Sequence, residues 1–358
     1  MSELNIEEVG LVITLRCTSR CRICGTSSHP GHTAVMPLEK GTEYLNQISS
    51  VPSIKLVGFT GGEPFLFFDK LSELMGHTQS LGLVSKVATN AFWAKTFKDA
   101  RAALAQLKNN GLEILCISAD TYHQEFIPVK RVMNAIGAAL ELEINLAITF
   151  IHGPGHGEGF DNFVEALQKS GFADRLIFMR NMDQPLRQFM GANYFKVRSQ
   201  FRDRILIRES TVLCAGRAQE FKDECYFSDV DELSKQPCIH AGRIMAVLPS
   251  GRLLWCCSPA AFDDNSFHVG DLNSESFDTL LKKVRKDSVI EYLATQGPYY
   301  MMKSLKELGC HFDDKYSGDC HLCAQMFREI GKETIAEKLE KSNTFETLLM
   351  KAIRDRMM

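Results

Sequence analysis

Residues 10–24 read GLVITLRCTSRCRIC, a β-branched run that leads directly into three closely spaced cysteines. The run predicts a buried strand over Gly10–Leu15. Three residues separate Cys17 from Cys21 and two separate Cys21 from Cys24, so one loop can direct all three thiolates at a single metal centre. In a four-iron cluster held this way, one iron lacks a protein ligand and can bind a small molecule.

Short apolar runs alternate with segments of helical period from about residue 9 to residue 180, a pattern typical of a parallel βα architecture. The predicted strands are Gly10–Leu15, Ile54–Phe59, Leu83–Ala88, Glu113–Ile117, Asn145–Ile151 and Leu176–Met179, and the predicted helices lie near Pro37–Ile48, Leu71–Leu81, Phe97–Asn109, Val129–Glu141 and Phe160–Lys169. Six βα units are fewer than the eight of a closed barrel, so the sequence predicts the α/β class with a partial, TIM-like (β/α)6 barrel. In such folds the loops that follow the strands carry the chemistry.

A second motif, Gly61-Gly62-Glu63-Pro64, follows the second predicted strand. Glycines let backbone groups approach a ligand closely, and a carboxylate pairs with an ammonium group. The alternative interpretation is a plain turn into a helix, with proline at the first helical position. The motif alone therefore indicates a ligand site without proving one.

Polar residues follow the third and fourth predicted strands as well. Thr89 and Asn90 end the third strand, and Ser118 ends the fourth, where Asp120 and His123 come next. If the strands are parallel, these residues lie at the same edge as the cysteines. Local turn chemistry is the alternative explanation for the first three, and a proton donor or acceptor among residues 120–125 stays open.

Zinc is the alternative to a cluster at the three cysteines, with His29 or His32 as fourth ligand, and buried thiols without metal are a further alternative. The motif Cys17-Thr-Ser-Arg-Cys21-Arg-Ile-Cys24, however, resembles the signature of the radical S-adenosylmethionine (radical SAM) superfamily. Gly61–Pro64, placed directly after a strand, is similar to the second motif of that family. One difference is Ile23, where the family often has an aromatic residue.

The resemblance implies a cofactor set and its binding residues. Cys17, Cys21 and Cys24 would hold a 4Fe-4S cluster, with Ser118 near the methionine carboxylate of S-adenosylmethionine. The full set of S-adenosylmethionine-binding residues implied is Gly61, Gly62, Glu63, Pro64, Asn90 and Ser118. The cluster, reduced by a donor such as flavodoxin or ferredoxin, would cleave S-adenosylmethionine to a 5'-deoxyadenosyl radical. That radical would remove a hydrogen atom from an unactivated carbon of the substrate.

A second group of cysteines lies in the last third of the chain. Cys238 is followed by twelve residues, Gly251, four residues and Cys256, and Cys320 and Cys323 form a later pair. A hairpin over Arg243–Leu248 and Leu253–Cys256 is predicted between the first two. Four thiolates suit either zinc or a 4Fe-4S cluster. The spacing resembles the twitch domain, a shortened SPASM domain, which implies an auxiliary 4Fe-4S cluster held by Cys238, Cys256, Cys320 and Cys323.

The other cysteines have less certain places. Cys310 either replaces one of the four auxiliary ligands or lies beside them unbound. Cys257 and Cys116 are predicted to be core residues, since each falls in or next to an apolar strand. Cys214 and Cys225 stay unassigned.

Residues 195–237 are charged and weakly periodic, so they are predicted to hold the domain junction. We expect a radical SAM domain over residues 1–215 and a twitch/SPASM-like domain with C-terminal helices over residues 216–358. Arg217, in a Gly-Arg-Ala segment often found in twitch enzymes, is expected near the cofactor or substrate, or in a surface salt bridge.

The composition is that of an ordinary globular protein, with 358 residues, 45% of them hydrophobic, and a formal net charge of -3. It gives no sign of nucleic-acid or membrane binding. The acidic N-terminus differs from a signal peptide, and no apolar run has membrane-spanning length, so the sequence predicts a cytoplasmic protein.

The sequence predicts a radical SAM oxidoreductase and leaves the substrate open. The first hypothesis is a maturase that modifies a ribosomally made peptide. The alternative is a small-molecule dehydrogenase or other biosynthetic enzyme in which the auxiliary cluster accepts an electron. The first strand starts near residue 9, which leaves no room for a fused N-terminal peptide-binding domain and tempers the peptide hypothesis. A cluster-bearing or zinc-bearing binding protein without activity is the third hypothesis.

Overall fold

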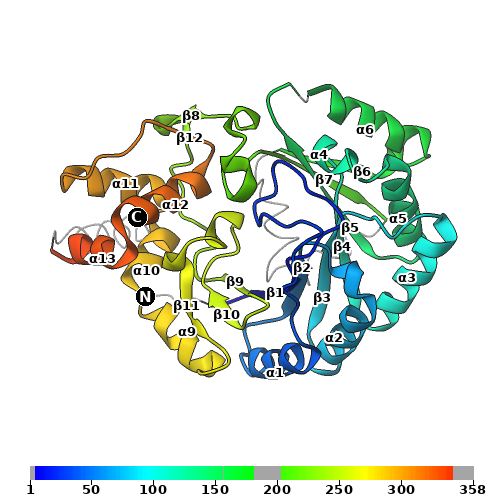
Figure 1. Ribbon diagram of the computed structural model, residues 1–358, viewed down its shortest axis with the longest axis horizontal. Coiled ribbons are helices and arrows are strands. Elements are labelled where there is room, and N and C mark those ends of the chain that lie inside the picture. Colours follow the sequence, from blue (N-terminus) through cyan, green and yellow to red (C-terminus); the bar gives the residue numbers. More distant parts are fainter. Residues whose placement is uncertain (1–4, 156, 181–202, 342–358) are drawn as a thin grey trace, which may run out of the picture.

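The computed structural model describes residues 5–155, 157–180 and 203–341. Within these residues, ten strands form one sheet in the order β11-β10-β9-β1-β2-β3-β4-β5-β7-β6. The first seven strands along the chain run parallel to one another: β1 (Glu8–Thr14), β2 (Leu56–Gly61), β3 (Val84–Thr89), β4 (Leu112–Ser118), β5 (Asn145–His152), β6 (Leu176–Arg180) and β7 (Ile205–Thr211). The helices between them are α1 (Leu38–Ser49), α2 (Phe68–Ser80), α3 (Phe97–Asn109), the short α4 (Thr121–Gln124), α5 (Val129–Glu141) and α6 (Gly157–Lys169). The main helices cover the outer side of the curved sheet (Figure 1).

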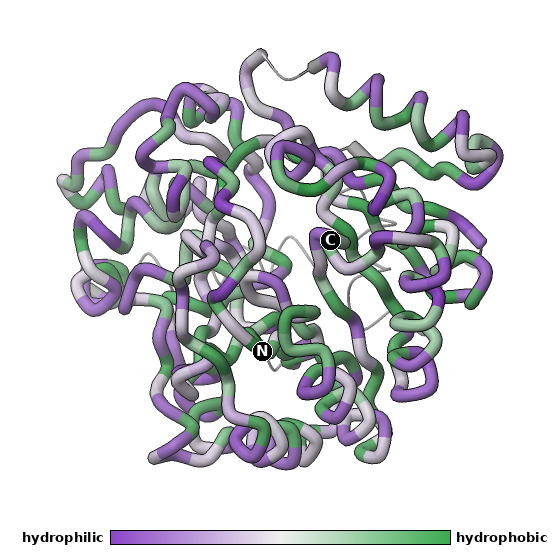
Figure 2. The backbone as a smooth tube through the Cα atoms, turned by 45° about the vertical axis from the view of Figure 1, so that its right-hand side comes forward, coloured by the Kyte–Doolittle hydropathy of each residue, from purple (hydrophilic) through white to green (hydrophobic). Residues whose placement is uncertain are grey.

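The strands alternate between a buried outer face and a partly exposed inner face. Val87 and Leu115 are fully buried in the core that includes the outer helices. Lys86 and Cys116, their neighbours along the strands, are only partly buried. Because side chains alternate across a strand, the sheet presents apolar side chains to the helices, while its concave interior carries Lys86 beside a smaller apolar cluster of Leu56, Ile114, Ala147 and Leu206. Helix α6 is amphipathic, because hydrophilic and hydrophobic residues follow one another along its turns (Figure 2).

The prediction of α3 and α5 is confirmed to the residue, and the other predicted helices and strands are found with small shifts at their ends. Thr96 caps α3 by accepting a hydrogen bond from the backbone N–H of Asp99 at 3.1 Å. The sixth predicted strand is confirmed as β6, which lies at the edge of the sheet. Strand β7, from the segment expected to be a junction, lies between β5 and β6. Its second half, Arg208–Thr211, is polar, which hid the strand pattern.

The predicted hairpin is confirmed as β9 (Ile244–Val247) and β10 (Arg252–Leu254). Strand β9 pairs in parallel with β1, so the hairpin continues the sheet of the N-terminal half. Gly251 closes its turn at φ +93°, where a Cβ atom would lie 2.4 Å from Asn273 Nδ2 and 2.6 Å from the Tyr44 hydroxyl. The turn therefore requires glycine for both its conformation and its space.

The C-terminal elements pack beyond the hairpin, on the side away from the parallel strands (Figure 1). They are β8 (Ser228–Asp229), β11 (His268–Asp271), α9 (Phe277–Arg285), α10 (Ser288–Thr295), α11 (Pro298–Glu307), β12 (Lys315–Tyr316), α12 (Asp319–Ile330) and α13 (Lys332–Lys341). Trp255, after β10, stacks on Phe267 with 4.9 Å between ring centroids and meets the edge of Phe327 on α12. In the described part of the chain, none of the helices combines the length and apolarity needed to span a bilayer.

Candidate active site

The cysteine loop leaves β1 at the C-terminal edge of the sheet. Its ends are held by backbone hydrogen bonds from Leu15 to Ala34 at 3.1 Å and from Cys17 to His29 at 3.2 Å. Cys21 is buried, whereas Cys17 and Cys24 are partly exposed. The loop thus fixes three thiols at the edge where the sequence predicts the chemistry.

The surroundings of Cys17 suit a sulfur that carries negative charge. Burial raises the pKa of Cys17 to about 11, and burial likewise raises the pKa of Cys21, so neither is a thiolate at neutral pH without a bound cation. Two N–H donors nevertheless face the Cys17 sulfur, from the Ser19 backbone at 3.4 Å and from Asn90 Nδ2 at 3.7 Å. Metal binding removes the thiol proton, and such donors then stabilise the ligating sulfur. The donor set therefore fits an iron–sulfur cluster.

The two glycines of the second motif pack against the backbone that enters the cysteine loop. A Cβ atom on Gly61, at φ +144°, would lie 2.1 Å from the Thr14 carbonyl oxygen, and one on Gly62 would lie 2.3 Å from that of Arg16. Hydrogen bonds join the same segments, from Gly62 N to Thr14 O at 2.7 Å and from Glu63 N to Arg16 O at 2.9 Å. A side chain at Gly61 or Gly62 would therefore push the second motif away from the backbone of the cysteine loop. The interpretation of a plain turn into a helix is therefore incomplete.

Glu63 is completely buried and accepts three hydrogen bonds. The donors are the backbone N–H of Phe65 at 3.1 Å, the Thr89 hydroxyl at 2.9 Å and the backbone N–H of Asn90 at 2.8 Å. Burial raises the pKa of the carboxyl to about 7, although these three hydrogen bonds act in the opposite direction. Glu63 thus holds the end of β3 against the end of β2.

Asn90 connects the second motif with the cysteine loop. Its backbone N–H bonds to Glu63, while its side-chain amide faces the Cys17 sulfur and donates to the Thr18 hydroxyl at 3.1 Å and the Ser19 hydroxyl at 3.5 Å. The structure therefore brings together three of the sequence-predicted site segments, after β1, β2 and β3. Ser118, at the end of β4, is partly exposed at the same edge.

A carboxylate–histidine pair follows β4. Asp120 is fully buried, and its two carboxylate oxygens lie 2.8 and 2.9 Å from His123 Nδ1. Burial lowers the pKa of His123, but Asp120 more than reverses this and the net shift is upward. Since charge on His123 also interacts with Glu63, the pair lies near the buried carboxylate of the second motif.

The four predicted auxiliary cysteines lie near one another. Burial raises the pKa of each thiol, and the nearby Cys238 raises the pKa of Cys256, Cys320 and Cys323 further. The Cys256 sulfur also accepts from the backbone N–H of Ser258 at 3.4 Å. Cys310 follows α11 instead, where its backbone N–H bonds to Leu305. The four are Cys238, Cys256, Cys320 and Cys323.

The prediction of a core residue is wrong for Cys257, whereas Cys116 packs against a small buried apolar cluster. Cys257 is exposed, and burial raises its pKa; Glu8, Cys320 and Lys86 lie close enough for their charges to influence that pKa as well. Cys257 is thus reached by solvent while protein atoms surround much of its side chain, as at a concave surface. Cys116 is partly exposed on the inner face of β4, near Lys86 and Glu8. The periodicity of a strand shows that side chains alternate between its two faces, but it does not show which face solvent reaches.

The inner face carries a buried ion pair across three strands. Lys86 Nζ on β3 lies 2.5 Å from Glu8 Oε1 on β1, and the side chains are 14% and 5% exposed. The strand between them contributes Gly58, where a Cβ atom would lie 3.0 Å from Lys86 Cε and 3.2 Å from Glu8 Oε1. Glycine therefore makes room for the pair. This pair lies toward the N-terminal ends of the strands, beside Cys257.

Sequence reasoning did not pair Cys214 with Cys225. Both are buried in one apolar cluster with Cys21, and their thiols are hydrogen-bonded to each other. Arg217 was expected near the cofactor or substrate, or in a surface salt bridge. The salt-bridge alternative is wrong, because Arg217 is 6% exposed and its guanidinium binds backbone carbonyls of the cysteine loop.

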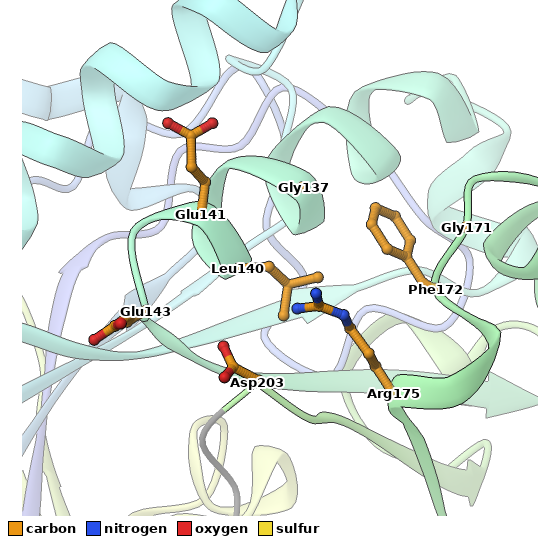
Figure 3. Close-up of a pocket in the computed structure, with 8 residues that line it drawn as sticks. All are labelled: Gly137, Leu140, Glu141, Glu143, Gly171, Phe172, Arg175 and Asp203. Atoms are coloured by element: carbon orange, nitrogen blue, oxygen red, sulfur yellow. The ribbon is translucent and has the colours of Figure 1, made fainter.

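A cavity of about 390 Å³ lies away from this edge. Glu143, Arg175 and Asp203 line it, and each precedes the N-terminal end of a strand (Figure 3). The triad and the second motif follow the C-terminal ends. The cavity is therefore at the opposite end of the sheet from the candidate site.

Across the residues described, no three side chains of His, Cys, Asp and Glu converge closely enough to hold one metal ion. A preformed zinc site with His29 or His32 is therefore not seen. His29 instead accepts a hydrogen bond from Gly31 N at 3.0 Å and lies 4.3 Å from the His32 ring. A four-iron cluster is larger than one ion and its thiolates bind different irons, so its ligands stand further apart.

Fold and site together define a class. Residues 11–170 match the family model described as the radical SAM superfamily, and this range includes the cysteine triad, the second motif and five of the parallel strands. The part of the chain that carries the candidate site is therefore similar to the radical SAM superfamily.

Individual relatives resemble almost the whole chain. YydG of Bacillus subtilis (strain 168), whose name points to peptide biosynthesis, is 23% identical over 335 residues, which cover 90% of this chain and 93% of YydG. Streptococcus suis SuiB bound to precursor peptide SuiA superposes with a TM-score of 0.54 and 13% identity, over 89% of this chain and 76% of SuiB. anSMEcpe with bound AdoMet and Cp18Cys peptide superposes with a TM-score of 0.50 and 12% identity, over 95% of this chain and 99% of anSMEcpe. The structural likenesses establish a shared fold.

Proposed function

We propose that this protein is a radical SAM oxidoreductase that cleaves S-adenosylmethionine reductively and abstracts hydrogen from an unactivated carbon of a ribosomally made peptide. The observation that carries the proposal is Asn90, whose backbone binds Glu63 at 2.8 Å and whose side chain faces Cys17 at 3.7 Å. One residue thus couples the proposed cluster loop to the proposed S-adenosylmethionine segment. When bound by Cys17, Cys21 and Cys24, a 4Fe-4S cluster supplies the electron, delivered by a flavodoxin or ferredoxin.

The protein's own residues have separate tasks in this proposal. Gly61 and Gly62 bring the second motif into contact with the loop backbone, and Glu63 supplies buried negative charge for the ammonium of S-adenosylmethionine. Ser118, partly exposed at the end of β4, is proposed to reach the methionine carboxylate. The concave inner face of the sheet, where Cys257 is exposed and Cys116 is partly exposed, is then the natural place for substrate.

The auxiliary site is proposed to hold a second 4Fe-4S cluster on Cys238, Cys256, Cys320 and Cys323, within a twitch/SPASM-like domain that begins near residue 216. Support comes from the mutual proximity of these thiols and from the Ser258 N–H that faces the Cys256 sulfur at 3.4 Å. Its proposed role is to position substrate or to accept an electron.

The peptide substrate rests on the relatives. YydG covers both proposed domains, and its name points to peptide biosynthesis. SuiB and anSMEcpe, which share the fold, were each solved with a peptide. We further propose a cytoplasmic protein without nucleic-acid or membrane partners.

The cluster claim is tested by anaerobic reconstitution of the full chain. We expect about eight irons per chain and about four in the variant in which Cys17, Cys21 and Cys24 are alanine. With dithionite and S-adenosylmethionine, the wild type should release 5'-deoxyadenosine and this triple variant should not. Release of 5'-deoxyadenosine by the triple variant would refute the assignment of the radical-generating site. Four irons plus one zinc in the wild type would refute the auxiliary cluster.

The substrate claim needs a separate experiment. Short peptides encoded beside the gene are incubated with reconstituted protein, reductant and S-adenosylmethionine, and then analysed by mass spectrometry and chiral amino-acid analysis. A change in the peptide that needs all three cysteines supports a maturase. Stimulation of 5'-deoxyadenosine release by a metabolite, with every peptide unchanged, would favour the small-molecule alternative.

A further inference from the structure

Arg217 reaches the cysteine loop from the other half of the chain. Its guanidinium donates from Nη1 to the Cys21 carbonyl at 2.7 Å and from Nη2 to the carbonyls of Ser27 at 2.8 Å and Ser28 at 2.7 Å. Its backbone N–H donates to the Cys24 carbonyl at 3.0 Å. One residue therefore binds four carbonyls of the loop, from Cys21 through Cys24 to Ser28.

The backbone around Arg217 is built for this approach. It belongs to a short 3-10 helix, Gly216–Gln219, that begins with glycine at φ +54°. A Cβ atom on Gly216 would lie 2.3 Å from the Gly25 carbonyl oxygen and 2.6 Å from that of Cys24. Only glycine permits both the conformation and the contact, so this segment is fitted to the loop along its backbone as well as through the guanidinium.

The opposite side of the loop is closed as well. A Cβ atom on Gly25 would lie 2.3 Å from Pro259 Cβ, and Pro259 follows the auxiliary cysteine Cys256 by three residues. The end of the loop is thus confined between the Gly216 segment and the start of the auxiliary region. It has little freedom to move without moving one of them.

The charge of Arg217 stays in the protein interior. The side chain is 6% exposed, and a guanidinium keeps its proton at any physiological pH. Within the described residues its partners are carbonyl oxygens and no carboxylate, so its positive charge is solvated by dipoles without being cancelled. A fixed cation behind the loop favours the reduced, more negative state of a redox centre in front of it.

We propose that Arg217 is a positioning residue of the cysteine loop, which fixes the carbonyls around Cys21 and Cys24 and raises the reduction potential of the cluster held there. The inference rests on the proposed function, because it requires a redox-active cluster on the triad. A unit charge beside a redox centre changes the reduced-to-oxidised ratio by about tenfold at the effective dielectric of a protein. Binding three carbonyls at once also needs the planar guanidinium with its several N–H donors. Lysine can therefore replace the charge of Arg217 but not its geometry.

Three variants separate charge from geometry. Arg217→Met removes both, Arg217→Lys keeps the charge, and the control Arg20→Gln removes a positive charge from an exposed position of the same loop. After anaerobic reconstitution, iron and sulfide content, the electron paramagnetic resonance spectrum of the reduced cluster and its midpoint potential are measured, with circular dichroism to verify folding. The auxiliary site is removed in parallel by Cys323→Ala, so that the two clusters are read separately.

We expect Arg217→Met to lower the reduced-to-oxidised ratio at fixed potential by about tenfold and to lose iron to a chelator faster than wild type. Arg217→Lys should keep the potential near that of wild type but show an altered spectrum and faster iron loss, and Arg20→Gln should match wild type in all three measurements. If Arg217→Met fails to fold, the Arg217→Lys variant decides the test. A spectrum and an iron retention equal to those of the wild type would then overturn the positioning role. An unchanged potential in a folded Arg217→Met protein would overturn the electrostatic role. A wild-type chain without a four-iron cluster on the triad would instead overturn the proposed function, and this inference with it.

Discussion

Replacing Glu63 by glutamine should weaken binding of S-adenosylmethionine by about 10- to 150-fold. The carboxylate accepts hydrogen bonds from Phe65 N, the Thr89 hydroxyl and Asn90 N at 2.8 to 3.1 Å. Glutamine has nearly the same shape, but its NH2 group must face at least one of these donors, and it offers no charge to an ammonium. Losing a hydrogen bond to a charged group costs about 1.5–3 kcal/mol, which is the range of the expected loss in affinity.

The same carboxylate predicts a pH dependence with a definite sign. Burial raises the pKa of Glu63 to about 7, so below that pH the folded protein carries a neutral acid here. Binding an ammonium then requires removal of the proton, and the apparent dissociation constant is multiplied by about 11 at pH 6.0 but only about 1.3 at pH 7.5. Affinity should therefore fall by about eightfold from pH 7.5 to pH 6.0, and Glu63→Gln should remove this dependence.

Isothermal titration calorimetry of S-adenosylmethionine into anaerobically reconstituted protein measures both effects without any substrate. Glu73→Gln is the matched control. It removes the same charge, but Glu73 is exposed on α2, outside the hydrogen bonds that hold Glu63. Wild-type affinity in Glu63→Gln, or equal affinity of the wild type at the two pH values, would refute the role assigned to this carboxylate.

Three further predictions follow from contacts at the two sites and the inner face. Gly62→Ala should give folded protein that takes up at least twofold less iron at the triad by iron assay, because its Cβ would collide with the loop backbone; normal iron uptake would contradict this. Lys86→Met should destabilise the apo protein in urea by about 3 kcal/mol near pH 8, since it leaves the Glu8 carboxylate buried alone, and the loss should shrink toward pH 5 as Glu8 takes up a proton. Adding Glu8→Gln should restore most of that stability, and an unimproved double variant would argue against the pair. Cys323→Ala should lower bound iron by about half, whereas Cys310→Ala should leave it unchanged.

Local sequence was enough to predict which segments meet at the candidate site. The three cysteines and Gly61–Pro64 each lie within a few residues of a strand end, so the βα pattern placed them at one edge. The βα pattern put Asn90 at the same edge, its role at the cofactor came from the family resemblance, and the structure adds its contact with Cys17. Such features depend on short-range spacing and on the direction of a strand, which periodicity reveals.

The features that sequence analysis missed depend on contacts between distant segments. Strand β7 enters the sheet between two strands that precede it, and the second half of its sequence is polar, so its pattern resembles a charged linker. Cys214 and Cys225 become neighbours only through a loop, and Arg217 meets Cys21 across 196 positions of sequence. Neither periodicity nor spacing can report such pairs without a three-dimensional fold.

These long-range contacts explain why the two cysteine groups should not be treated as independent modules. Gly25 lies between the Gly216 backbone and Pro259, so the triad loop reaches its final form only after both segments have folded against it. The hairpin that leads to Cys256 also pairs with β1, the strand from which the triad loop departs. Since β1 adjoins both the triad loop and the hairpin, a change in the structure of either cysteine group can shift the other through this strand. Cluster insertion at the triad is therefore expected to depend on the fold of the C-terminal half, even though all three of its proposed ligands precede residue 25.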